Sequence, residues 1–193
     1  YCSNKIWNIG RCSRRTWNAH ATDVKEEQKR MKYYVAYGSN LNREQMAHRC
    51  PEAKLVGTGM LSNYEMVFRG NKSNAVATVE PKKGMEVPVG IWEISENDEH
   101  FLDRYEGYPH LYEKKNLRIS NGTITTEAMV YVMNDGYEYG VPGKEYYEII
   151  KQGYKDCSLD EKYLDEAVEK MKETVLNQTE AAMYPYGYRD VRQ

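Results

Sequence analysis

The chain has 193 residues, of which 40% are hydrophobic and 29% are charged, and its formal net charge is -2. This composition argues against intrinsic disorder and against electrostatic binding of nucleic acid. No run of the sequence approaches the roughly 20 apolar residues that are needed to cross a bilayer. We therefore expect one globular domain with spare sequence at its ends, and a small molecule or a protein as its partner.

The first thirty residues show neither helical nor strand periodicity, and they end just before Met31, where a convincing strand begins. We interpret Tyr1 to Arg30 as leader sequence translated in frame, or another non-native extension, with Met31 as the natural start. Lys25-Glu26-Glu27 can be encoded by AAG-GAG-GA, which matches a bacterial ribosome-binding sequence. The alternative is a genuine N-terminal extension that packs as a short helix. The segment lacks the apolar stretch of a signal peptide, so we expect a cytoplasmic protein.

The cysteines are scattered through the chain without a C-x-x-C pair, which argues against a zinc knuckle and against a disulfide framework. Free thiols in a reducing cytoplasm are the simplest interpretation. They are Cys2, Cys12, Cys50 and Cys157.

From Tyr33 onward, short runs of β-branched and aromatic residues alternate with turn residues, and helical segments interrupt them and close the chain. We predict an α+β domain over residues 31–176. The strands are too numerous for a parallel sheet with so few crossovers, which favours a closed or nearly closed barrel. The expected strands are Tyr33 to Tyr37, Ala53 to Leu61, Tyr64 to Phe68, Ala75 to Glu80, Val87 to Ile94, Leu111 to Ile119 and Thr123 to Met133.

Two short helices are expected between the strands. One covers Arg43 to Arg49, and the other covers about Glu96 to Tyr105, with Ser95 as its N-cap and Gly107 just after its end.

The last two strands should form a hairpin, because Asn121-Gly122 can adopt the positive φ angles of a two-residue type I′ turn. Two further helices, Lys144 to Lys155 and Asp160 to Leu176, carry apolar residues at helical spacing and are expected to form an outer layer. The tail over 177–193 contains Tyr-Pro-Tyr-Gly-Tyr, which is too broken for a helix and either covers the body or extends from it.

The loop from Tyr37 to Leu41 follows the first strand and precedes a helix, so its backbone N–H groups have no ladder partner and can hold an anion. Gly38 allows a ligand to approach the backbone closely, and Ser39 and Asn40 add side-chain donors and acceptors. The alternative is an ordinary strand-to-helix turn in which the Asn is a cap.

Glu106 lies in the last helical turn before Gly107. The negative end of the helix dipole and partial dehydration by the flanking Tyr105 and Tyr108 should both raise its pKa toward the range of a general base. The alternative is a solvated glutamate at a helix end, and Asp103, one turn earlier, is its nearest rival.

Other chemistries are poorly supported. Ser39 lacks the G-x-S-x-G elbow of a hydrolase nucleophile, and His48, His100 and His110 show no metal-ligand spacing. We therefore expect no metal site.

Several blocks together resemble the γ-glutamylcyclotransferase-like (AIG2-like) family. They are Tyr-Val-Ala-Tyr-Gly-Ser-Asn-Leu after Met31, Val-Gly-Ile-Trp-Glu-Ile at 89–94, Leu-Asp-Arg-Tyr-Glu-Gly-Tyr at 102–108, Val-Tyr-Val-Met at 130–133 and Tyr-Tyr-Glu-Ile-Ile-Lys-Gln-Gly-Tyr at 146–154. The resemblance implies a mixed β-barrel flanked by helices and no cofactor. It also implies that the loop Tyr37, Gly38, Ser39, Asn40 and Leu41 grips a glutamyl group, that Glu106 is catalytic, and that Tyr112 and Tyr131 line the pocket.

The implied reaction converts a γ-glutamyl amino acid to 5-oxoproline and a free amino acid, when the α-amine attacks the γ-carbonyl of its own chain. The partner would be a small γ-glutamyl substrate, and a homodimer is one expected assembly. Two alternatives stay open: a γ-glutamylamine cyclotransferase, and a non-catalytic binding or interaction module on the same fold.

Overall fold

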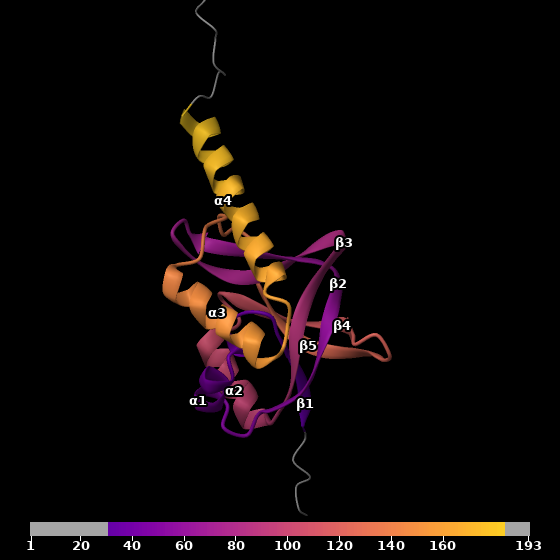
Figure 1. Ribbon diagram of the computed structural model, residues 1–193. Coiled ribbons are helices and arrows are strands. Elements are labelled where there is room, and N and C mark those ends of the chain that lie inside the picture. The colour runs from indigo at the N-terminus through magenta and orange to yellow at the C-terminus, as the bar shows by residue number, and fades with distance from the viewer. Residues whose placement is uncertain (1–30, 184–193) are drawn as a thin grey trace, which may run out of the picture.

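A closed five-stranded β-barrel forms the centre of the computed structural model, which describes residues 31–183 (Figure 1). Its strands follow the order β1-β3-β2-β4-β5. β1 runs parallel to β5, and the other neighbours are antiparallel, so the predicted mixed barrel flanked by helices is confirmed. The strands are β1 (Lys32–Ala36), β2 (Lys54–Asn71), β3 (Asn74–Ile94), β4 (Tyr112–Ser120) and β5 (Thr125–Met133).

β2 and β3 are each continuous where the sequence analysis expected two strands. The register shifts between Ser62 and Tyr64, where Asn63 adopts a positive φ of 63°. The Asn63 side chain accepts the backbone N–H of Gly84 at 3.1 Å, which bridges the irregular part of the two strands. Bulges of this kind let a ladder continue past residues that otherwise indicate a turn.

β4 and β5 pair from Tyr112–Met133 to Ser120–Thr125, which confirms the expected hairpin. The predicted two-residue type I′ turn is wrong, because residues 121–124 form the connection and Gly122 alone among them has a positive φ. The physical reason is the Asn121 side chain. Its Oδ1 accepts the N–H groups of Thr123 and Ile124 at 3.0 and 2.9 Å, which stabilises a wider loop.

The two short helices are α1 (Arg43–Arg49) and α2 (Glu96–Glu106), close to their predicted bounds. At the start of α2, Ser95 and Asp98 form a reciprocal capping box, and Gly107 ends the helix with a φ of 66°.

Two longer helices follow, α3 (Lys144–Asp156) and α4 (Lys162–Met183). α4 runs past its expected end at Leu176, since the residues over 177–183 include neither Gly nor Pro, and its second half extends beyond the barrel (Figure 1). The expected leader over 1–30, with Cys2 and Cys12, and the Tyr-Pro-Tyr-Gly-Tyr part of the tail lie outside the described residues.

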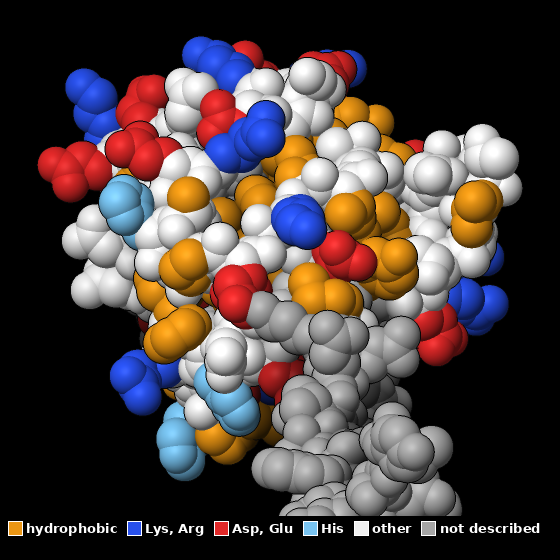
Figure 2. Space-filling model, turned by 90° about the horizontal axis from the view of Figure 1, so that it is seen from below, with side chains coloured by type: hydrophobic (Ala, Val, Ile, Leu, Met, Phe, Trp, Pro, Cys, Tyr) orange, Lys and Arg blue, Asp and Glu red, His pale blue; other side chains and the backbone are white. Residues whose placement is uncertain are grey.

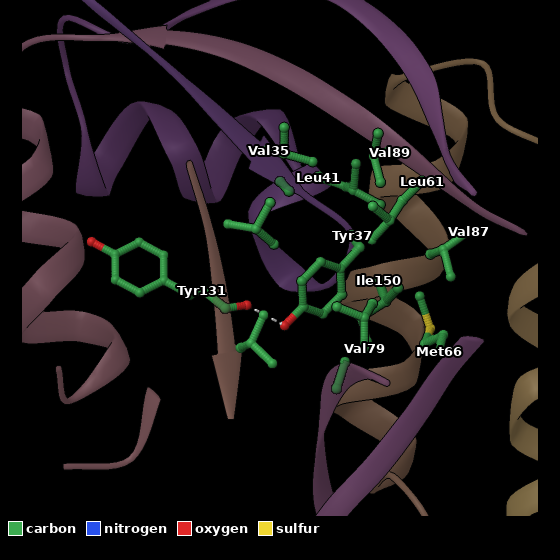
Figure 3. Packing of buried hydrophobic residues seen from close by; sticks show 14 of the residues in the cluster. Val35, Tyr37, Leu41, Leu61, Met66, Val79, Val87, Val89, Tyr131 and Ile150 are labelled. Atoms are coloured by element: carbon green, nitrogen blue, oxygen red, sulfur yellow. Dashed lines mark hydrogen bonds between the residues drawn. The ribbon is translucent and has the colours of Figure 1, made fainter. Parts of the chain in front are cut away.

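The core fills the barrel and continues between the barrel and the outer helices. Tyr37 places its ring among aliphatic side chains and donates its hydroxyl to the backbone oxygen of Tyr131 at 2.6 Å (Figure 3). Cys50 and Cys157 are buried free thiols, as expected. Among the described residues, no helix is long and apolar enough to cross a membrane. On the face seen in Figure 2, acidic and basic side chains are interspersed rather than gathered by sign.

Candidate active site

A small cavity of about 30 Å³ lies where the loop after β1 meets the end of α2. The structure brings together there most of the predicted site residues, which come from segments far apart in the chain. They are Tyr37, Gly38, Ser39, Asn40, Glu106, Tyr112 and Tyr131, and the remaining lining residues are Tyr34, Ala77 and Tyr146.

Leu41 does not belong to this lining, which corrects its predicted place among the substrate contacts. Its side chain is fully buried in the core. A Cβ at Gly153 of α3 would lie 2.6 Å from the Leu41 Cβ, so the helix backbone packs directly on this residue. Leu41 therefore anchors the loop to α3 instead of facing a ligand.

The pKa of Glu106 is raised to about 7, chiefly because the carboxyl group is buried. The flanking Tyr105 and Tyr108 are 47% and 41% exposed and do not line the cavity. The cavity walls around the carboxyl group are largely tyrosine rings. A hydrogen bond from Asn40 and the charge of Arg49 oppose the rise in pKa.

Asn40 holds the carboxylate of Glu106 in place. Its Nδ2 donates to Glu106 Oε1 at 2.8 Å and to the Tyr34 hydroxyl at 2.7 Å, and its Oδ1 accepts from Arg49 Nη1 at 2.5 Å. Because a guanidinium can only donate, the amide has one orientation, with its nitrogen toward Glu106. The Arg49 guanidinium also lies 3.7 Å from the centre of the Tyr105 ring.

The loop itself forms a short 3-10 helix over Ser39–Leu41. The N–H groups of Leu41 and Asn42 donate to the backbone oxygens of Gly38 and Ser39. The first N–H groups of a helical turn have no acceptor within that turn, so those of residues 38–40 are available beside the cavity. A Cβ at Gly38 would lie 3.5 Å from the Tyr146 hydroxyl, so any larger side chain there would narrow the pocket. These donors suit a carboxylate.

The tyrosine hydroxyls of the pocket are oriented by the protein. Tyr112 donates to the Ala77 backbone oxygen at 2.7 Å, and Tyr131 donates to Asp103 Oδ1 at 2.6 Å. Burial raises the pKa of Tyr37, Tyr112 and Tyr131, so all three are neutral at ordinary pH. Each hydroxyl that has given its proton to a protein acceptor still offers lone pairs to a ligand donor, such as an ammonium group.

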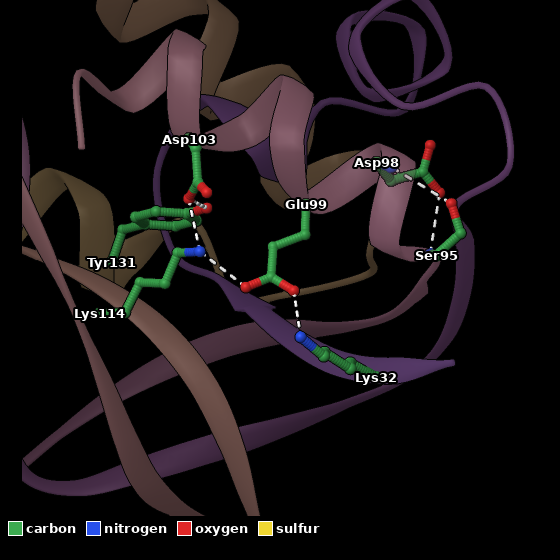
Figure 4. A network of polar contacts seen from close by, with 7 residues as sticks. All are labelled: Lys32, Ser95, Asp98, Glu99, Asp103, Lys114 and Tyr131. Atoms are coloured by element: carbon green, nitrogen blue, oxygen red, sulfur yellow. Dashed lines mark hydrogen bonds and ion pairs between the residues drawn. The ribbon is translucent and has the colours of Figure 1, made fainter. Parts of the chain in front are cut away.

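Asp103, the rival carboxylate, does not line the cavity and belongs to a polar network with Glu99, Lys114 and Tyr131 (Figure 4). It forms an ion pair with Lys114 at 2.6 Å, and Lys114 also contacts Glu99 at 2.6 Å. This arrangement leaves Glu106 as the carboxylate that faces the cavity.

Sequence reasoning missed Tyr34, Arg49 and Tyr146. Tyr34 stands in the same motif as the loop, six residues before Asn40, and this closeness was an available signal. Tyr146 arrives from α3, where its hydroxyl accepts the N–H of Ala77 at 3.3 Å, and no local pattern predicts that contact. Within residues 31–183, no group of three or more His, Cys, Asp or Glu side chains could hold a metal ion.

The comparisons with known proteins agree with one another. A family model described as "Gamma-glutamyl cyclotransferase, AIG2-like" matches residues 34–155. A human protein named "Gamma-glutamylcyclotransferase" is 27% identical over 157 residues, which are 76% of this chain and 82% of that protein. A mouse protein of the same name is 28% identical over 141 residues, which are 67% of this chain and 73% of that protein.

A solved structure named "Gamma-glutamyl cyclotransferase" shares the fold, with a TM-score of 0.66 at 22% identity over 77% of this chain and 99% of that one. Because the family model matches more than half of the sequence, the chain belongs to the gamma-glutamyl cyclotransferase, AIG2-like family.

Proposed function

We propose that this protein is a γ-glutamylcyclotransferase that converts γ-glutamyl amino acids to 5-oxoproline and the free amino acid, with Glu106 as its acid/base. One observation carries the proposal. A carboxyl group whose pKa is raised to about 7 lies in a cavity and is held by the side chain of the same loop that offers free backbone N–H groups. A group that titrates near neutrality can both take and return a proton.

The proton balance of the reaction needs a single carboxyl group. The ionised Glu106 accepts a proton from the α-ammonium group, and the neutral amine then attacks the γ-carbonyl of the same molecule. A carbon–nitrogen bond closes the five-membered ring, the bond to the leaving amine breaks, and Glu106 returns its proton to that amine. The ring nitrogen loses its second proton through the same carboxyl group to the departing amine, which leaves as an ammonium ion. General acid/base catalysis of this kind contributes about 10² to 10⁴ in rate.

The remaining pocket residues would bend and hold the glutamyl chain. The N–H groups of residues 38–40 suit its α-carboxylate, and the lone pairs of the tyrosine hydroxyls suit its α-ammonium. Holding both ends brings the amine close to the γ-carbonyl, and such orientation contributes several kcal/mol in well-arranged systems.

The test is to incubate the purified protein with γ-glutamyl-alanine, glutathione and γ-glutamyl-ε-lysine, and to detect 5-oxoproline by mass spectrometry. We expect 5-oxoproline from at least the γ-glutamyl amino acid, and none above background from Glu106→Gln. Product from the ε-lysine substrate alone would replace the proposal with a γ-glutamylamine cyclotransferase. No product from any substrate, with γ-glutamyl ligands still bound, would identify a binding module.

A further inference from the structure

Arg49 lies in the last turn of α1, beside the candidate active site but outside the lining of its cavity. Its guanidinium is half-buried, and Nη1 donates to Asn40 Oδ1 and, at 3.4 Å, to Ser39 Oγ. Nη2 donates to Gln45 Oε1, and the centre of the Tyr105 ring lies 3.7 Å from the guanidinium carbon. Because two nitrogens of one planar group bind different acceptors, the guanidinium is held in one orientation.

The contact with Asn40 passes this orientation on to Glu106. Asn40 is only 4% exposed, and its Nδ2 donates to Glu106 Oε1 at 2.8 Å and to the Tyr34 hydroxyl at 2.7 Å. If the amide turned by 180°, its nitrogen would meet the donors of the guanidinium, and its oxygen would face Glu106. An amide N–H beside a carboxyl group favours the ionised form, whereas an amide oxygen favours the protonated form. Arg49 therefore selects the arrangement in which Glu106 can accept a proton.

The charge of Arg49 acts in the same direction, because it favours the ionised carboxylate and lowers the pKa of Glu106. The other titratable groups that interact with Glu106, within the described part of the chain, are tyrosines and one thiol. Burial raises the pKa of each of them, so they are neutral at ordinary pH. They are Tyr34, Tyr37, Cys50, Tyr112, Tyr131 and Tyr146.

From these contacts we infer that Arg49 is a positioning residue, which fixes the Asn40 amide with its nitrogen toward Glu106 and so sets the pH range in which this carboxylate accepts a proton. Arg49 acts through Asn40 from outside the cavity. The inference rests on the proposed role of Glu106 as acid/base, and it adds the residue that controls this role.

The first test titrates Glu106 by carbon-13 NMR, which needs no turnover. Arg49→Met keeps a long side chain and removes both the charge and the donors. We expect the pKa of Glu106 to rise by about one pH unit, because the loss of a neighbouring positive charge and the loss of a fixed N–H donor both favour the protonated carboxyl group. Arg49→Gln, which keeps a polar side chain at this half-buried position, gives the same comparison if Arg49→Met does not fold.

Steady-state kinetics then shows whether the altered titration changes the reaction. With the pKa raised by about one pH unit, roughly ten times less Glu106 is ionised at pH 6, whereas most of it is ionised at pH 9 in both proteins. The loss of kcat/KM in Arg49→Met should therefore be about tenfold larger at pH 6 than at pH 9. A purely structural defect would lower the rate by the same factor at both pH values.

Two further variants distinguish this role from a general effect of substitutions in α1. Arg49→Lys keeps the charge and a donor for Asn40 but loses the planar fork, so it should bring the pKa of Glu106 at least halfway back to the wild-type value. Arg43→Met removes a positive charge from the exposed first turn of the same helix, and it should leave both the pKa of Glu106 and kcat/KM unchanged.

A double-mutant cycle shows whether Arg49 acts through Asn40. Arg49→Met is introduced into the wild type and into Asn40→Ala, and the pKa of Glu106 is measured in all four proteins. Because Asn40→Ala removes the amide that Arg49 orients, Arg49→Met should then raise the pKa by no more than half as much as it does in the wild type. The remaining rise measures the direct effect of the charge.

The inference is overturned if Arg49→Met leaves the pKa of Glu106 within about 0.2 of the wild-type value. It is also overturned if the loss of kcat/KM is equal at pH 6 and pH 9, or if the two steps of the cycle are equal. If the wild type formed no 5-oxoproline while the pKa of Glu106 still rose in Arg49→Met, the proposed function would fail and the positioning role would stand.

Discussion

Helix α2 carries two carboxylates one turn apart, at neighbouring positions of one face, and their surroundings differ. Glu106 faces a cavity walled by tyrosine rings, and burial raises its pKa to about 7. Asp103, three residues earlier, is contacted by Lys114 and by the Tyr131 hydroxyl. Two similar groups close together in sequence therefore have different surroundings, and the difference arises from which side chains of the barrel contact each carboxylate.

The largest expected effect comes from exchanging each carboxylate for its amide. Glu106→Gln removes the acid/base and should lower kcat/KM for 5-oxoproline formation by about 10² to 10⁴. Asp103→Asn, the matched change three residues earlier in α2, should lower it less than about tenfold. Steady-state kinetics on both variants checks this, and equal losses would show that the two carboxylates do not differ in function.

Asn40→Ala should have the next largest effect. It removes the hydrogen bond to Glu106 Oε1 and leaves Arg49 without its acceptor on Asn40. A hydrogen bond to a charged group contributes about 1.5 to 3 kcal/mol, so kcat/KM should fall about 10- to 100-fold. Because this bond lowers the pKa of Glu106, the acid side of the pH–rate profile should also move to higher pH. A fall in rate with an unmoved profile would contradict the positioning role.

The raised pKa also predicts how stability depends on pH. The folded state holds the Glu106 proton more tightly than the unfolded state, so its ionisation opposes folding progressively as pH rises from about 4.5 through 7. At pH 8, Glu106→Gln should therefore be more stable than the wild type by about 1 to 3 kcal/mol, and this advantage should nearly vanish at pH 4.5. Urea unfolding at both pH values measures it. Asp103→Asn is the control and should gain no stability at pH 8.

The smallest effect is expected from a substitution in the polar network formed by Glu99, Asp103 and Lys114. Lys114 contacts Glu99 and Asp103 and is only partly exposed, so Lys114→Met should lower the free energy of unfolding by about 1 kcal/mol. Its kcat/KM should change less than about threefold, because the network meets the pocket at Tyr131, through its hydroxyl and the outer face of its ring. A large kinetic loss would show that this polar network tunes the pocket.

Local patterns were sufficient for much of this fold. Capping residues located α2, and alternating residues located the strands and the β4–β5 pair. These patterns gave wrong predictions where a side chain forms hydrogen bonds with the backbone and so changes the local conformation. Asn63 bridges the irregular part of β2 and β3, and Asn121 widens a turn that its neighbour Gly122 had suggested would be tight.

Some residues of the candidate site could likewise be predicted from local sequence, and others could not. The loop after β1 and Glu106 could be named from short motifs, because each lies beside its own turn or helix end. Tyr146 could not, since its contact with Ala77 spans 69 residues and depends on how α3 packs on the barrel. Leu41 was misplaced because the motif that contains it does not indicate which side chain faces the cavity and which faces α3.

The most direct test of the account measures the titration of Glu106 and the pH dependence of the reaction in the same protein. Carbon-13 NMR of glutamate side chains, with Glu106→Gln to assign the signal, gives its pKa, and kcat/KM for 5-oxoproline formation gives the acid side of the rate profile. The account predicts that both midpoints lie near 7. A Glu106 that titrates near 4.5, or a rate that stays constant well below pH 6, would contradict it.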